Sequence, residues 1–128
     1  MLDGKGHLKK LLKKLLPFLK KKGSNVKDLI VVIGPCISVK NYEIKRDFLK
    51  KFLKKDKKNK IYFKFLHNKI FFDLRKYISF QIKSFGIKKL EIINKDTFSE
   101  KNSYFSARRS LVKKENDYGR NISLIMIN

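Results

Sequence analysis

The sequence predicts a layered α/β fold in which a mixed sheet is flanked by helices. Two kinds of segment alternate along the 128 residues. Lysine-rich stretches carry apolar residues at helical spacing, whereas short runs of Ile, Val and Leu have the composition of buried strands. Because such segments alternate, helices that cover a sheet are the expected architecture. Hydrophobic residues make up 42% of the chain, which is enough for one domain to bury a core.

The first predicted helix covers residues 8–22. Its apolar face consists of Leu8, Leu11, Leu12, Leu15, Leu16 and Leu19. Pro17 is expected to kink this helix or to end its regular hydrogen bonding, and Gly23 with Ser24 closes the segment. We expect the leucines to pack on a sheet, although a basic helix of this kind can also lie on an anionic membrane.

The run over residues 28–33 is predicted to be a strand buried on both faces, because it is apolar, β-branched and stopped by a Gly-Pro pair. A second helix is predicted over residues 44–53, followed by a charged surface loop at 54–60. Residues 61–66 are apolar, and their pattern leaves a strand and irregular packing both open.

A third helix is predicted to begin near Asp73, which is a plausible cap, and to end at Gly86. Residues 87–93 then predict a second buried strand of the same kind as the first. The pattern ends with a loop at 96–103 and a closing strand at 121–127.

The formal net charge of +22 would ordinarily suggest nucleic acid or an anionic surface as a partner. However, only five of the 33 basic residues are arginines, and Ile and Asn are plentiful while Trp is absent. An AT-rich genome produces this bias in all of its proteins, so we expect most lysines to be solvated. The alternative is a basic module that binds nucleic acid or an anionic membrane through the helix at residues 9–22.

Cys36 is the only cysteine, which excludes an internal disulfide and fits a reducing compartment. No apolar run reaches the roughly 18 residues of a membrane span, and the first residues do not have the pattern of a signal peptide. We therefore expect a cytoplasmic protein.

Three arginines within a short stretch form the strongest candidate anion site: Arg108, Arg109 and Arg120. A guanidinium binds phosphate or carboxylate through two parallel hydrogen bonds, which a lysine cannot do. The alternative is that these arginines pair with the nearby acidic residues and hold the terminal loops in place. Those acidic residues are Asp96, Glu100, Glu115 and Asp117.

A metal site built from Cys36, His7 and His67 is not expected. A cysteine and two histidines can hold zinc, but no two of these residues lie within one helical turn of each other in the sequence. We expect Cys36 to be a packed side chain and His67 to be an exposed loop residue. Glycine-rich phosphate loops are also missing from the sequence, and no catalytic residue can be assigned from it.

Six short segments follow one another in a recognisable order over residues 29–128. They are Val32-Ile33-Gly34-Pro35-Cys36-Ile37, Tyr42-Glu43-Ile44, Phe72-Asp73-Leu74, Gly86-Ile87-Lys88-Lys89-Leu90, Tyr104-Phe105-Ser106-Ala107-Arg108-Arg109-Ser110 and Gly119-Arg120-Asn121-Ile122. In this order they resemble the C-terminal half of the laccase-domain family, also labelled multicopper polyphenol oxidase or YfiH-type. The chain therefore looks like one partial domain of that fold over residues 1–128.

The resemblance implies a zinc-dependent purine nucleoside phosphorylase that acts on adenosine, inosine and methylthioadenosine, with deamination of adenosine as a related activity. Purine nucleoside and phosphate are the implied ligands. The residues expected to line the substrate cleft are Tyr104, Ser106, Arg108, Arg109 and Arg120. Three positions depart from the family pattern, namely Thr97, Ala107 and Ser110.

In the family, two histidines and a cysteine hold the zinc, in segments resembling Q-V-H-G, T-A-D-C and H-A-G-W-R-G that precede the stretch matched here. If residues 3–6 correspond to G-W-R-G, the ligand histidine falls near Met1. We therefore expect this chain alone to bind no zinc and to be inactive. It would be a truncated reading frame, or one piece of a split enzyme whose N-terminal half is supplied by another chain.

Overall fold

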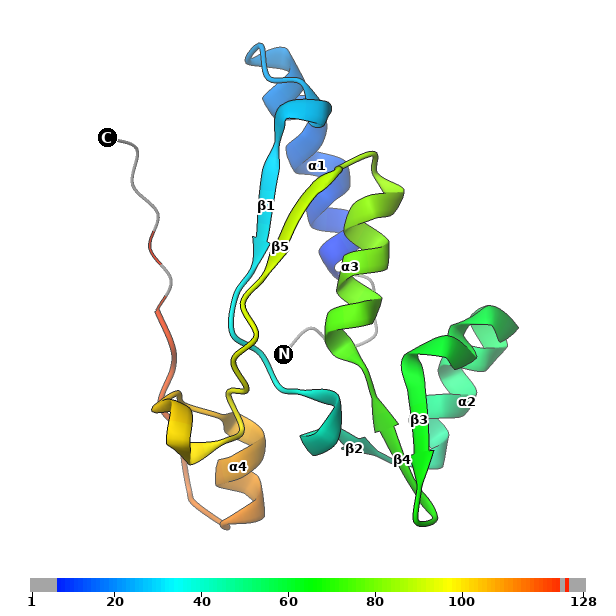
Figure 1. Cartoon of the computed structure of the whole chain (residues 1–128), viewed down its shortest axis with the longest axis vertical. Helices are drawn as coiled ribbons and strands as arrows, with labels where there is room; N and C mark the ends of the chain where they lie inside the picture. The colour runs from blue at the N-terminus through cyan, green and yellow to red at the C-terminus, as the bar shows by residue number, and fades with distance from the viewer. Residues whose placement is uncertain (1–6, 123, 125–128) are drawn as a thin grey trace.

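A computed structural model describes residues 7–122 and 124, and it confirms the predicted α/β class (Figure 1). The elements run in the order α1 His7–Lys21, β1 Ile30–Ile33, β2 Glu43–Ile44, α2 Arg46–Lys55, β3 Phe63–Leu66, β4 Lys69–Phe72, α3 Leu74–Ser84, β5 Lys89–Ile92 and α4 Ala107–Val112. Short 3-10 turns connect several of them.

The strands form two sheets, one parallel and one antiparallel. Strands β1 and β5 pair in parallel, with Ile30 opposite Lys89 and Ile33 opposite Ile92. Strand β4 lies between β2 and β3 and pairs antiparallel with both. Parallel and antiparallel pairing are thus both present, in separate sheets.

Helices α1 and α3 lie on the same side of the parallel sheet (Figure 1). The core between these layers joins Leu12 of α1, Ile33 of β1 and Ile78 with Ile82 of α3. The predicted packing of α1 on a sheet is confirmed, since Leu12 is buried and Leu8 and Leu16 pack beside it. The helix continues through Pro17 to Lys21, and Gly23 follows with a φ of +91° that favours glycine.

The prediction that the two parallel strands are buried on both faces is wrong. Ile30 and Val32 of β1 are 66% and 52% exposed, and Lys89, Glu91 and Ile92 of β5 are exposed as well. The apolar run is continuous, but helices cover only one face within the described part of the chain. The sequence pattern therefore indicates more burial than these residues alone provide.

A second, aromatic core lies between α2 and the antiparallel sheet. Phe52 of α2 faces Phe63 of β3 and Phe72 of β4, with ring centroids 5.6 and 5.1 Å away. Phe72 is only 2% exposed. Leu74, at the start of α3, packs against both cores and so connects the two halves of the molecule.

Helix α3 begins and ends where the sequence predicts. The Asp73 carboxylate accepts a hydrogen bond from the Lys76 amide at 3.0 Å, and Gly86 has a φ of +86°. The second predicted helix is confirmed as α2, but it runs from Arg46 to Lys55, because Ile44 pairs in β2 and does not begin the helix. Residues 96–103 are a loop with one 3-10 turn at Glu100–Asn102. Most of the charged segment at 54–60 is exposed as predicted, although a 3-10 helix begins within it at Lys57.

The β3–β4 hairpin has no counterpart in the sequence prediction beyond the ambiguous run at 61–66. Its turn consists of His67 and Asn68, which both adopt positive φ, at +48° and +59°. A two-residue turn of this kind matches the twist of paired strands. The closing strand predicted at 121–127 lies largely outside the described residues, and Asn121, Ile122 and Leu124 are not in a strand.

Candidate functional site

A cavity of about 890 Å³ runs along β5 and α3 and reaches the segments that follow the carboxyl ends of β1 and β5. Ligands of open parallel sheets commonly bind at this edge. Helix α3, the segment after β1 and the loop after β5 all contribute to its wall. The lining residues used below are Lys40, Arg75, Lys76, Ser79, Lys83, Leu90, Ile92, Asn94, Asp96, Ser99 and Asn102.

Arg75 joins the chain segments that follow the two parallel strands. Its Nη2 donates to the carbonyl oxygens of Cys36 at 3.1 Å and Lys95 at 2.7 Å. Its Nη1 donates to Asn94 Oδ1 at 2.7 Å, and its Nε lies 3.4 Å from Cys36 Sγ. Because α3 holds the start of this side chain, the guanidinium fixes the edge of the cavity relative to the helix.

Asp96 joins the same two segments one residue further along. Its carboxylate accepts hydrogen bonds from the Ser38 hydroxyl, from Asn41 Nδ2 at 2.6 Å and from the Phe98 amide at 2.8 Å. Burial raises the pKa of Asp96, but these hydrogen bonds outweigh it, so the pKa lies below its ordinary value. The carboxylate therefore stays charged and holds the two segments together.

The cavity has a cationic wall and an apolar wall. Lys76, Ser79 and Lys83 lie at i, i+3 and i+7 on α3 and so share one helical face. Leu90 and Ile92 of β5 also line the cavity and supply apolar surface. Such a site suits a ligand that combines an anionic group with a flat or apolar part.

Arg108 connects α4 to the antiparallel sheet. Its Nη1 donates to the Glu43 carbonyl oxygen at 2.7 Å, and its guanidinium carbon lies 4.9 Å from the centre of the Tyr42 ring. Burial raises the pKa of the Tyr42 hydroxyl, and the positive charge of Arg108 opposes that shift. The side chain thus holds α4 against β2.

Arg109 holds the loop that precedes α4. Its Nη1 donates to the carbonyl oxygens of Thr97 at 3.2 Å and Phe98 at 3.0 Å, and its Nη2 donates to that of Tyr104 at 2.7 Å. Ser106 is buried and caps the same helix, because its hydroxyl accepts a hydrogen bond from the Arg109 amide at 3.3 Å. Arg109 therefore positions the loop whose residues Asp96, Ser99 and Asn102 line the cavity.

Arg120 makes its contacts within its own segment. Its Nη1 donates to the Tyr118 carbonyl oxygen at 2.9 Å, its Nη2 lies 3.7 Å from the Asp117 carboxylate, and its guanidinium lies over the Tyr118 ring. Asn121 exchanges two hydrogen bonds of 2.9 Å with the backbone of Phe105. This pair brings the segment of Arg120 alongside that of Tyr104.

The five predicted site residues are thus neighbours in the fold, but their described contacts do not converge on one ligand. The predicted pairing with acidic residues holds for Arg120 and Asp117. Arg108 and Arg109 instead donate to backbone carbonyl oxygens. Sequence reasoning missed Arg75, whose signal was its rarity in a lysine-rich chain and its place just after the Asp73 cap.

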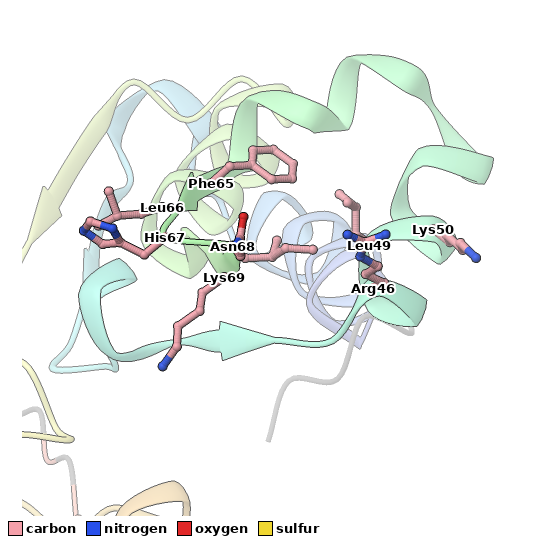
Figure 2. A pocket seen from close by; sticks show the side chains of 9 residues that line it. Arg46, Leu49, Lys50, Phe65, Leu66, His67, Asn68 and Lys69 are labelled. Carbon is pink, nitrogen blue, oxygen red and sulfur yellow. The ribbon is translucent and has the colours of Figure 1, made fainter.

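A second cavity, of about 460 Å³, lies between α2 and the β3–β4 hairpin. Figure 2 shows Arg46 and Lys50 at one end of this cavity and the hairpin turn with His67 at the other. His67 is exposed, as predicted. Of its lining residues, Lys69 donates to Glu43 Oε2 at 3.5 Å.

The described residues do not form a metal site. Across residues 7–122 and 124, no group of three or more His, Cys, Asp or Glu residues is placed to hold a metal ion. Cys36 is a free thiol. Its sulfur lies 3.4 Å from Nε of Arg75, so its described neighbour is a positively charged side chain. Nor does any helix in this part of the chain have the length and apolar character to cross a membrane.

Residues 4–128 match the family described as multi-copper polyphenol oxidoreductase laccase, and the chain belongs to this family. It is 34% identical over 120 residues to a purine nucleoside phosphorylase of Rickettsia conorii, an alignment that covers 92% of this chain and 49% of that protein. It is 33% identical over 107 residues to one of Rickettsia prowazekii, covering 82% of this chain and 44% of that protein. The predicted resemblance is confirmed, and the chain spans about half the length of these curated relatives.

Proposed function

We propose that this chain forms one part of a purine nucleoside phosphorylase. In that reaction a phosphate oxygen forms a bond to C1′ of the sugar while the bond from C1′ to the purine N9 breaks. The electron pair of the broken bond goes to the base, which takes up a proton. The products are a pentose 1-phosphate and a free purine, and adenosine, inosine and methylthioadenosine are the proposed substrates.

The likeness to two proteins that bear this name carries the proposal, because it extends over most of the chain. The cavity along β5 and α3 supports it, since its cationic wall and its apolar wall suit the two parts of the substrate pair. The ammonium groups of Lys40, Lys76 and Lys83 offer positive charge for phosphate. Leu90 and Ile92 offer apolar contact for the sugar or base.

In this proposal the residues around α4 shape the substrate cleft. Arg109 acts as a positioning residue, because its three carbonyl contacts fix the loop that carries Asp96 and Asn102. Tyr104, Ser106, Arg108 and Arg120 lie on the neighbouring segments and are proposed to border the same cleft.

The zinc that the resemblance implies needs ligands that the described residues do not supply. We propose that another polypeptide segment, corresponding to the N-terminal half of the family, carries the ligands. On this view the chain alone is inactive, and activity requires both halves.

The test joins this chain to the half of the Rickettsia conorii protein that it does not match. Release of hypoxanthine from inosine and phosphate is measured for the joined protein and for the chain alone, with bound zinc determined in both. We expect hypoxanthine and bound zinc only in the joined protein. A joined protein that binds zinc but releases no hypoxanthine would overturn the proposal, and so would turnover by the chain alone.

A second candidate function rests on α1, which keeps a second apolar stripe exposed. Leu11, Leu15 and Phe18 lie at i, i+4 and i+7 and are exposed, with lysines beside them. Such a helix can bind an anionic membrane. Sedimentation with vesicles that contain phosphatidylserine tests this function. We expect binding that falls as the salt concentration rises and that is lost when Lys9, Lys13 and Lys20 are changed to Glu. Unchanged binding by that variant removes the candidate.

A further inference from the structure

We propose that the outer face of the parallel sheet is a docking surface for the polypeptide segment that corresponds to the unmatched half of the curated relatives. We define the outer face by the side chains that alternate with the inward-facing Val31, Ile33 and Leu90. Its members are Ile30, Val32, Lys89, Glu91 and Ile93. The proposal rests on the proposed function, because the docking segment is the one proposed above to complete the enzyme, but its test measures binding and not catalysis.

The outer face is apolar but exposed. Its three aliphatic side chains, Ile30, Val32 and Ile93, are 66%, 52% and 43% exposed. Both α1 and α3 lie on the opposite side of β1 and β5 (Figure 1). Parallel sheets occur almost only where both faces are covered, so a second layer belongs on this face.

The edges of the sheet point to the same conclusion. Strands β1 and β5 pair only with each other within residues 7–122. Each strand therefore keeps one edge along which backbone donors and acceptors meet no neighbouring strand in the described part. A two-stranded parallel sheet is an incomplete unit, and its free edges accept further strands.

The charge of the outer face distinguishes it from a solvated surface. Charged residues make up 34% of the chain and the formal net charge is +22, yet β1 carries no charged residue and β5 contributes Lys89 and Glu91, whose charges cancel. A neutral, β-branched patch in so basic a chain is suited to burial. A second copy of this chain would bring another +22 to the contact, and like charges disfavour that association.

The length of the relatives indicates which polypeptide segment would dock on the outer face. The matched stretch covers 49% and 44% of the two Rickettsia proteins, so about half of each has no counterpart in the alignment. A segment of that size can add strands to the free edges and a layer over Ile30 and Val32.

The test uses the full 128-residue chain and, as a probe, the unmatched half of the Rickettsia conorii protein produced separately. The two are mixed, and their complex is measured by light scattering after size-exclusion chromatography. Hydrogen exchange of the β1 and β5 amides is followed with and without the probe. We expect a one-to-one complex and at least tenfold slower exchange in both strands.

A matched pair of substitutions locates the contact. Val32→Lys places a charge on the outer face, whereas Ile61→Lys places one at an exposed apolar residue, 55% exposed, in the turn before β3. We expect Val32→Lys to weaken the complex at least tenfold and Ile61→Lys to leave it within twofold. Far-UV circular dichroism of each variant checks that the chain is folded.

Three results would overturn the proposal: no complex, a complex that Val32→Lys leaves unchanged, or a homodimer of this chain that protects the outer face without the probe. If Val32→Lys unfolds the chain, hydrogen exchange in the unsubstituted protein tests the proposal instead. The probe is then tethered ahead of Met1 by a flexible linker, which raises its effective concentration to roughly the millimolar range. Amides of β1 that still exchange as in the free chain contradict docking, and protected amides support it even if the complex is inactive.

Discussion

At the scale of single residues, two polar side chains organise the cavity at the sheet edge. Arg75 donates to atoms of Cys36, Asn94 and Lys95, which follow the two parallel strands. Asp96 accepts hydrogen bonds from Ser38 and Asn41 in the segment after β1 and from Phe98 in its own loop. Their hydrogen bonds hold together the segments that follow β1 and β5. The apolar packing of α1 and α3 alone would not fix the position of these segments.

Replacing Arg75 by Lys should destabilise the fold by roughly 2–3 kcal/mol, because one ammonium cannot reproduce hydrogen bonds in several directions. Urea unfolding monitored by circular dichroism measures the change. Arg46→Lys is the matched control, since Arg46 is exposed on α2, and it should change stability by less than about 0.5 kcal/mol. Equal stability of the two variants would contradict the role assigned to Arg75.

Asp96 should make folding sensitive to acid. Its folded pKa lies below the ordinary value of 3.8, so its carboxylate stabilises the fold above that value, and this contribution is lost as pH falls through the folded pKa. Asp96→Asn should therefore flatten the dependence of the free energy of unfolding on pH below about pH 5. Urea titrations from about pH 3 to 7 test this, with exposed Asp47→Asn as the control. An Asp96→Asn curve parallel to that of the unsubstituted chain would exclude the effect.

At the scale of elements, the sequence predicts those segments whose structure depends on local signals. Helix α3 has a cap at Asp73 and a terminating glycine at Gly86, and the structure uses both. The β3–β4 hairpin escaped prediction because its turn residues, His67 and Asn68, adopt positive φ without glycine. The two parallel strands are apolar throughout, but their burial depends on layers that no local pattern specifies.

The terminal segment offers a test of element packing at Gly119. A Cβ atom on Gly119 would lie 2.1 Å from Cδ1 of the Phe105 ring, which is too close for any side chain. Gly119→Ala should therefore displace the Phe105 ring, which is 55% exposed, and weaken the neighbouring hydrogen bond from the Phe105 amide to Asn121, at a local cost of about 1 kcal/mol. Faster hydrogen exchange at Phe105 would report it.

Phe105→Ala removes the obstructing ring. The double variant with Phe105→Ala and Gly119→Ala should therefore be less destabilised than the sum of the two single variants predicts. Hydrogen exchange at residue 105 in the two single variants and the double variant completes the cycle. Exchange in Gly119→Ala that equals that of the unsubstituted chain would show that the segment does not depend on this contact.

At the scale of the whole molecule, the order of short motifs predicted the family, whereas the residues alone predicted little of the cavity. The sequence makes Arg108, Arg109 and Arg120 candidates for binding an anion or for pairing with nearby acidic residues. The guanidinium groups of Arg108 and Arg109 instead donate to carbonyl oxygens that no sequence pattern reveals. Lys76 and Lys83 could not be distinguished from the other lysines until the fold placed them opposite β5.

The measurement that tests the central claim most directly is the KM for phosphate of the joined protein when Lys76 and Lys83 are both changed to Gln. If the cavity binds phosphate, this KM should rise by about tenfold or more while kcat changes little, because a charge-assisted contact is lost. The control is Lys50→Gln with Lys54→Gln, an exposed pair one turn apart on α2. A KM for phosphate within twofold of that of the unsubstituted joined protein would contradict the claim that phosphate binds at the edge of the parallel sheet.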